Sequence, residues 1–272
     1  MSDRAGPLFI IGGHEDKSGD RRILSAIAER LNGGRLVIAT VASHEPKGYF
    51  DAYRAAFGAL GLTDLVELYV DDRGDTLNEE SKALLEGAAG LFFTGGDQLR
   101  IASQIGDTPI EAGVRALHAR GGVIAGTSAG ASIMSETMLV GGASAVSHRI
   151  GDLHMAPGLG LVPNVIIDQH FAERGRIGRL LGAVAHNPRV VGIGIDEDTA
   201  IVVEGGSFTV LGVGGVTVVD AAKVTRSNIA EARAACALSM HDVTLHALSE
   251  GDRFALAARR PVRERDDAGQ SN

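Results

Sequence analysis

Short apolar runs alternate with amphipathic stretches over the first two-thirds of the chain. The apolar runs have the length of buried strands and occupy residues 7–13, 35–40, 64–70, 90–96, 122–126, 164–170 and 190–196. The stretches between the first five runs have helical character and occupy residues 20–31, 47–60, 78–88 and 108–122, the last with Pro109 in its first turn. This alternation predicts an α/β fold with a doubly wound, mostly parallel sheet and helices on both faces.

The pattern changes after Asp196. Residues 199–220 form short β-rich runs that are broken by pairs of glycines, and such runs are typical of antiparallel strands at the edge of a sheet. No repeat and no linker rich in proline or serine divides the chain. We therefore expect a single domain over residues 1–260, followed by a charged, frayed tail over residues 261–272.

Composition narrows the range of functions. The chain has 272 residues, and 26 basic against 34 acidic side chains give a net charge of −8, which argues against a general nucleic-acid binder. The single cysteine, Cys236, permits neither an intrachain disulfide nor a cysteine-rich zinc site, and we expect no metal. No apolar run reaches about 18 residues, and the first run is too short for a signal peptide. We expect a cytoplasmic protein without membrane contact.

A segment rich in glycine and serine, residues 122–132, follows one of the predicted strands. A phosphate-binding loop needs a lysine after its last glycine, and no lysine lies near Gly126 or Gly130. The dinucleotide fingerprint requires a different glycine spacing after the first strand of the fold. We therefore expect no nucleotide cofactor, and no other cofactor is indicated.

The same segment fits the pattern G-x-S-x-G, with Ser128 at its centre. In that motif a sharp strand-to-helix turn exposes the serine, and the following helix N-terminus directs N–H groups toward a developing oxyanion. Glycine and serine are common residues, so an ordinary glycine-rich turn also fits these five positions. The motif alone leaves both interpretations open.

A serine nucleophile needs a base and a group that orients the base. His170 ends a predicted parallel strand, at the edge of the sheet where open α/β folds bind their ligands. Glu197 follows another predicted strand and is flanked by Asp196 and Asp198. The alternatives are a structural histidine and a solvated acidic turn. The order serine, histidine, glutamate differs from that of the common α/β-hydrolases.

A third strand end carries two glycines, Gly95 and Gly96, followed by Asp97 and Gln98. Paired glycines there free backbone N–H groups for an oxyanion hole, and Gln98 is a candidate for substrate binding. The alternative is a plain turn that begins a helix.

Five segments in this order resemble the cyanophycinases, which are serine peptidases related to peptidase E on a fold like that of class I glutamine amidotransferases. The segments are GGHEDK (12–17), FTGGDQLR (93–100), GTSAGAS (126–132), DQHFAERGRIGRL (168–180) and GIGIDEDTA (192–200). The resemblance covers the chain from about Leu8 to Ala257. One departure is His14, which stands where the family pattern has alanine and has no assigned role.

The resemblance implies hydrolysis of cyanophycin, a polyaspartate whose side chains carry arginine in isopeptide linkage, with release of β-Asp-Arg dipeptides. It implies that Ser128 is the nucleophile, His170 the general base and Glu197 its orienting group, with backbone N–H groups of Gly96 and Ala129 as oxyanion donors. It also implies a homodimer. The substrate-binding positions that it implies are Gln98, Asp168, Gln169, Arg174, Arg176 and Arg179.

The chemistry of these residues agrees with such a substrate, because arginine forks bind carboxylates and carboxylates bind guanidinium groups. Without the resemblance, a solvated basic face is the simpler interpretation of the three arginines. Two other functions remain open: a dipeptidase like peptidase E that cleaves Asp-X bonds, and a non-catalytic homologue. A glutamine amidotransferase is poorly supported, because those domains use cysteine and Cys236 lies in a late segment.

Overall fold

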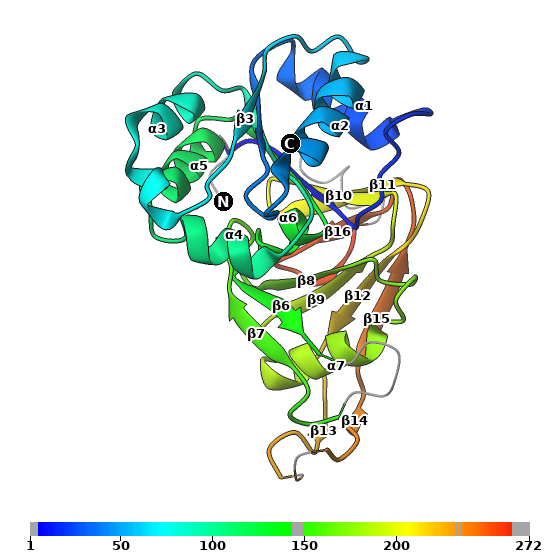
Figure 1. Cartoon of the computed structure of the whole chain (residues 1–272). Helices are drawn as coiled ribbons and strands as arrows, with labels where there is room; N and C mark the ends of the chain where they lie inside the picture. Colours follow the sequence, from blue (N-terminus) through cyan, green and yellow to red (C-terminus); the bar gives the residue numbers. More distant parts are fainter. Residues whose placement is uncertain (1–4, 143–148, 232, 234, 263–272) are drawn as a thin grey trace.

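The central sheet is built around five parallel strands. The computed structural model describes residues 5–142, 149–231, 233 and 235–262 (Figure 1). Neighbouring parallel strands pair in the order β3, β2, β4, β5, β1. Their bounds are Leu65–Leu68, Leu36–Ala39, Gly90–Phe93, Val123–Thr127 and Leu8–Ile11. The strands predicted from the first five apolar runs are therefore present, and they are adjacent in one sheet.

An antiparallel extension continues this sheet beyond β1, where β10 pairs antiparallel with β1. The extension comprises β10 (Thr199–Glu204), β11 (Ser207–Gly212), β16 (Arg253–Ala255) and β17 (Arg260–Pro261). The predicted antiparallel edge is thus confirmed for residues 199–212, whereas residues 216–220 belong to a different sheet. Residues 263–272 of the expected tail lie outside the described residues.

Helices cover both faces of the central sheet, as the alternation predicted (Figure 1). Side chains alternate along each strand, so Phe9 and Ile38 pack against one set of helices, while Leu8 and Val37 face the opposite core. One set is α1 (Arg22–Leu31) and α2 (Pro46–Gly58). The other is η1 (Arg73–Leu77), α3 (Glu79–Glu86), α4 (Gln98–Ile105), α5 (Pro109–Ala119) and α6 (Ala129–Ser132).

The last two apolar runs form strands of a second sheet. In it, β8 (Val165–Gln169) and β9 (Val191–Ile195) are parallel and are joined by α7 (Ile177–His186). This sheet continues through β12 (Val216–Asp220) and β15 (Thr244–Leu248), in the order β15, β12, β9, β8. Strands β8 and β9 are buried along their whole length, like β1 and β5 of the central sheet, so their sequence pattern does not reveal which sheet they join.

Helix α7 and the segment that precedes it pack closely on the second sheet because two positions of β9 are glycine. A Cβ atom at Gly192 would lie 2.8 Å from a methyl carbon of Leu180, and one at Gly194 would lie 2.4 Å from the ring of Phe171. Two short pairs complete the architecture, β6 (Thr137–Gly141) with β7 (His154–Pro157) and β13 (Arg226–Ser227) with β14 (Met240–His241). Within the described ranges, no helix has the length and apolarity needed to cross a bilayer.

The two sheets meet where the chain passes from β9 to β10. Strand β9 belongs to the second sheet and β10 to the central sheet, so the three residues between them lie at the junction. Backbone hydrogen bonds from His170 to Gly12 (2.7 Å) and from Asp198 to Gly13 (2.8 Å) tie the second sheet to the end of β1. The carboxyl ends of β1, β5 and β8 therefore converge with the 196–198 turn.

Candidate active site

Ser128 occupies the turn between β5 and α6. Its backbone has φ 55° and ψ −111°, a region that residues with a side chain rarely adopt, and its N–H donates to the carbonyl of Ile11 (3.0 Å). The flanking glycines permit the close approach of backbone on both sides. A Cβ atom at Gly126 would lie 2.3 Å from the carbonyl oxygen of Gly130, and one at Gly130 would lie 2.3 Å from that of Phe93. The strand and the short helix expected around the serine are both present.

His170 lies directly after β8 and faces the serine from the second sheet. Its Nε2 atom is 2.9 Å from Ser128 Oγ, and the residue has φ 47°. The imidazole packs against the backbone of Gly13, where a Cβ atom would lie 2.3 Å from the ring. Gly13 itself has φ 112°, so a side chain at this position would be both strained and in collision with the histidine.

Glu197 holds the other side of the imidazole, with its Oε1 atom 2.6 Å from His170 Nδ1. The two neighbouring acids serve the backbone instead. Asp196 accepts the N–H groups of Ala172 (3.0 Å) and Gly215 (2.9 Å), and Asp198 accepts that of Asp16 (2.9 Å). Of the three consecutive carboxylates, Glu197 is the one that contacts His170.

A second histidine contacts the same carboxylate. His14 Nδ1 lies 2.7 Å from Glu197 Oε2, and its ring is 5.1 Å from that of His170, edge to face. The His14 side chain is 72% exposed, so it forms the outer end of the row Ser128, His170, Glu197, His14. His14 has no role that follows from the sequence, and its only signal there is a titratable residue directly after two glycines at the end of a strand.

Burial and hydrogen bonding give His170 and Glu197 different charge states at neutral pH. Burial lowers the pKa of His170, and the hydrogen bond that the ring donates to Glu197 offsets this only in part. For Glu197, burial favours a higher pKa, but hydrogen bonds from His14 and His170 outweigh burial and bring the pKa below its usual value. At neutral pH the carboxylate is therefore charged and the His170 imidazole neutral. A neutral imidazole that donates Nδ1–H to Glu197 has its Nε2 lone pair available toward Ser128.

The glycine pair after β4 borders the nucleophile. A Cβ atom at Gly95 would lie 3.5 Å from Ser128 Cβ. Gly96 has φ 141°, and a Cβ atom there would lie 2.4 Å from the carbonyl oxygen of Ala42. Ala129 begins α6 directly after the serine, and the first N–H groups of a helix have no partner within it. The backbone of both predicted oxyanion donors therefore belongs to segments that adjoin Ser128. Gln98 is half-buried, and its amide donates to the Leu139 carbonyl (2.7 Å).

Most of the other predicted substrate-binding residues form a buried network. Arg179 Nε lies 2.6 Å from one oxygen of Asp168, and Arg176 lies 3.2 Å from the other. Arg176 also donates to the side chain of Gln169 (2.9 Å). Asp168 is fully buried and both guanidinium groups are less than 10% exposed. Burial lowers the pKa of Arg176 to about 10, which leaves it charged at neutral pH. Arg174, by contrast, is exposed.

Glu15 is a buried acid whose role is not evident from the sequence. Its carboxylate accepts hydrogen bonds from the Tyr53 hydroxyl and from Thr127 Oγ1, and it pairs with Lys17 Nζ at 2.7 Å. Thr127 immediately precedes Ser128. Glu15 thus joins the β1–α1 loop and α2 to the residue before the nucleophile.

One group of possible metal ligands occurs among the described residues. It consists of His14, His170 and Glu197, whose ligand atoms all lie within 4.8 Å of one another. In this structure the Nδ1 atoms of both histidines are directed at the two oxygens of Glu197. These contacts have the geometry of hydrogen bonds between the imidazoles and the carboxylate.

Comparison with known proteins gives consistent results. The profile of peptidase family S51 matches residues 8–211. Over 257 residues, the chain is 42% identical to a cyanophycinase of a Nostoc species, covering 93% of this chain and 86% of the relative. It is 38% identical to a cyanophycinase of Geminocystis herdmanii, covering 94% and 95% of the two chains.

Two solved structures share the fold. One is a peptidase from an acI-B1 Actinobacterium, with a TM-score of 0.67 and 24% identity over 92% of this chain and 97% of the other. The second is a candidate peptidase E from Listeria monocytogenes EGD-e, with a TM-score of 0.53 and 18% identity over 77% and 100% of the two chains. At these identities the likeness shows the fold alone.

Proposed function

The chain belongs to peptidase family S51 and is a serine-type peptidase, and we propose that it acts as a cyanophycinase. It would hydrolyse backbone α-peptide bonds of cyanophycin and release β-Asp-Arg dipeptides. The observation that carries this proposal is the contact of Ser128 Oγ with His170 Nε2 at 2.9 Å, in a chain 42% identical to a Nostoc cyanophycinase. The sequence order of serine, histidine and glutamate also separates this row from the common α/β-hydrolases.

The proposed reaction passes through an acyl-enzyme. Ser128 Oγ attacks the carbonyl carbon of the scissile bond while His170 Nε2 takes its proton, and the charged Glu197 stabilises the imidazolium. The C–N bond then breaks, and His170 gives the proton to the leaving amine. A water molecule that transfers a proton to His170 attacks the ester, which releases the acyl product, and the proton returns to Ser128.

The developing oxyanion needs donors that are already in place. We assign this role to the backbone N–H groups of Gly96 and Ala129. Their support is the position of the two segments: Gly95 adjoins Ser128 Cβ, and Ala129 is the first residue of the helix that follows the nucleophile. The positive φ of Gly96 is compatible with the tight approach of this loop.

The predicted substrate-binding residues form two groups, one at least partly exposed to solvent and one buried. Arg174 is exposed near His170 and has no ion-pair partner among the described residues, so its guanidinium can bind a substrate carboxylate. Gln98 is half-buried beside the glycine loop. The buried network of Asp168, Gln169, Arg176 and Arg179 supports the site from inside, because it anchors the end of β8 from which His170 follows. We propose that these four residues position the base and that Arg174 and Gln98 contact substrate.

Incubation of the purified protein with insoluble cyanophycin tests the function. Mass analysis of the soluble fraction is expected to show β-Asp-Arg, and the Ser128→Ala variant is the matched control. Cleavage of Asp-X dipeptides without release from the polymer would instead support a dipeptidase like peptidase E. If the wild-type protein cleaves neither cyanophycin nor Asp-X dipeptides, the result would support a non-catalytic homologue.

The proposal also covers the extent of the domain, the oligomeric state and the cellular location. We propose that one peptidase domain spans residues 1–260, that the chain forms a homodimer and that it acts in the cytoplasm. A single cysteine is compatible with a reducing compartment, and Cys236 is exposed. Light scattering coupled to size exclusion would measure the oligomeric state, and fractionation of the producing cells would test the location.

A further inference from the structure

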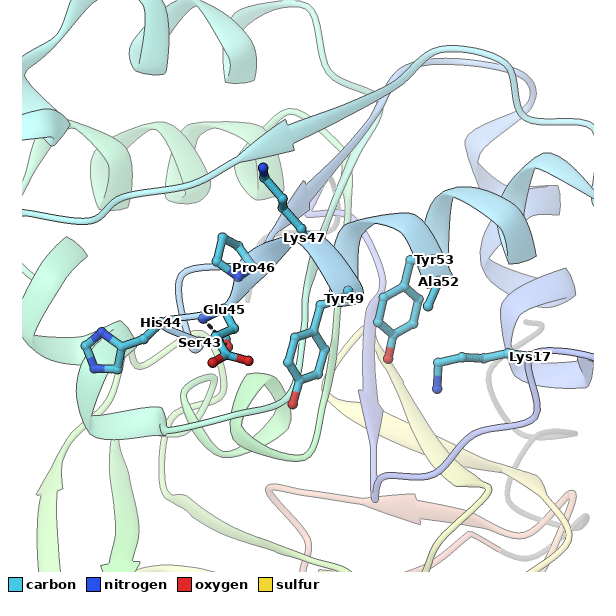
Figure 2. Close-up of a pocket in the computed structure, with 10 residues that line it drawn as sticks. Lys17, Ser43, His44, Glu45, Pro46, Lys47, Tyr49, Ala52 and Tyr53 are labelled. Atoms are coloured by element: carbon cyan, nitrogen blue, oxygen red, sulfur yellow. Dashed lines mark hydrogen bonds between the residues drawn. The ribbon is translucent and has the colours of Figure 1, made fainter.

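A large pocket opens beside the candidate active site. It has a volume of about 1080 Å³ and lies between the β1–α1 loop, which contributes Lys17, and the first two turns of α2 (Figure 2). The segment before α2 contributes Ser43 and Glu45, and the helix itself contributes Tyr49 and Tyr53. None of the predicted substrate-binding residues lines this cavity, which we name the α2 pocket.

Two series of residue contacts connect the α2 pocket with the segments next to Ser128. On one side, the carbonyl of Ala42, which precedes Ser43, accepts the N–H of Asp97 (2.9 Å). The same carbonyl lies so close to Gly96 that no Cβ atom would fit there, and the neighbouring Gly95 adjoins Ser128. On the other side, Tyr53 in the pocket wall donates to Glu15, which also binds the side chain of Thr127. The α2 pocket therefore adjoins the two segments that flank Ser128, the glycine pair after β4 and the end of β5.

The pocket presents opposite charges around an exposed aromatic ring. Lys17 Nζ is held 2.7 Å from the buried Glu15 and 4.9 Å from the centre of the Tyr53 ring, yet one-third of its side chain is exposed. Tyr49 is 39% exposed and follows Glu45 by four residues at the start of α2, and both residues line the pocket (Figure 2). Among the residues that the structure describes, no cation lies within ion-pair distance of the Glu45 carboxylate.

The local structure fixes these groups in place. The N–H of Glu45 donates to Ser43 Oγ (3.0 Å), which orders the turn at the start of α2. Figure 2 shows Tyr49, Tyr53 and Lys17 directed to the same side of the helix, whereas Lys47 points away from them. A carboxylate beside an aromatic face is an arrangement that binds a planar guanidinium, and a lysine binds a carboxylate.

We propose that the α2 pocket binds the arginine-bearing side chain of the substrate unit next to the scissile bond. The guanidinium would lie on the Tyr49 ring and pair with Glu45, and the free carboxylate of the same arginine would point toward Lys17. This inference rests on the proposed function and deepens it, because it assigns recognition of arginine to residues outside the catalytic row. Each such unit carries both charges that the pocket complements.

The test compares two soluble oligomers of aspartate, one with arginine and one with citrulline on every β-carboxyl group. Citrulline has nearly the shape of arginine but a neutral ureido group. The wild-type protein is expected to have a KM about tenfold lower for the arginine oligomer, the order expected for one charge-assisted hydrogen bond. Glu45→Gln should remove this preference and leave kcat within about twofold. Tyr49→Leu should weaken it.

The matched control is Asp51→Asn, which removes one negative charge from the same helix outside the pocket lining. It should retain the wild-type preference for arginine. If Glu45→Gln discriminates between the oligomers as well as the wild-type protein does, the α2 pocket is not the arginine site, although the proposed function stands. A wild-type protein that cleaves neither oligomer nor cyanophycin overturns the proposed function and this inference together.

Discussion

His14 Nδ1 lies 2.7 Å from Glu197 Oε2, on the opposite side of the carboxylate from His170. A glutamate bound through one oxygen can rotate about its terminal torsion, whereas one bound through both is held in a single plane. His14 thus limits the orientations of the group that orients the base. Because the imidazole is largely exposed, solvent reaches this end of the row directly.

Replacing His14 with alanine is expected to move the acid limb of the kcat/KM profile to higher pH. The hydrogen bond from His14 lowers the pKa of Glu197, and the charge of protonated His14 lowers that of His170. Both pKa values rise when the imidazole is removed, so protonation begins at higher pH. Rate measurements from pH 4 to 8 check this, with His241→Ala as a control that removes another exposed imidazole. An unmoved limb would reduce His14 to a surface contact.

For the wild-type protein, the acid limb itself should lie below pH 6.5, the ordinary value for histidine. Burial lowers the pKa of His170, and only the neutral imidazole accepts the serine proton. Acidification removes activity by protonating His170, so a lowered pKa extends activity toward acid. Titration of the His170 ring by NMR should give the same midpoint as the rate profile. A midpoint above 6.5 would mean that Glu197 stabilises the charged ring more than burial destabilises it.

Ser128→Ala should abolish turnover while it leaves the fold intact. Loss of the nucleophile from a triad typically costs several orders of magnitude in kcat. The side chain is small and only partly buried, so the melting temperature should stay within a few degrees of that of the wild-type protein. The measurement is dipeptide release from cyanophycin beside a thermal melt. Retention of more than a few per cent of kcat would exclude Ser128 as the nucleophile.

Arg179→Met is expected to destabilise the protein by about 3 kcal/mol, because removing one partner leaves much of the buried charge of Asp168 uncompensated. Urea denaturation measures the free energy of unfolding. Arg54→Met, which removes an exposed pair on α2, should change it by less than about 0.5 kcal/mol. A stable Arg179→Met protein with a raised KM would mean that this guanidinium serves the substrate rather than the fold.

Hydrophobic periodicity was sufficient to predict the parallel strands β1 to β5 and the helices α1, α2, α3 and α5 of the central sheet. It did not predict η1 or α4. The division of the strands into two sheets does not follow from this periodicity. Strand β9 is buried along its whole length whichever sheet it joins, so its sequence contains no information about its neighbours.

In the candidate site too, the features set by neighbouring residues differ from the contacts between distant segments in how far the sequence predicts them. The turn at Ser128 depends on glycines two residues away, so the sequence by itself determined its strand–turn–helix form. The choice of Glu197 over Asp196 and Asp198 depended on the tertiary structure, because the backbone N–H groups that bind the two aspartates come from distant segments. The contact of His14 with Glu197 and the burial of Arg176 and Arg179 likewise join residues that only the packing of the two sheets brings within hydrogen-bonding distance.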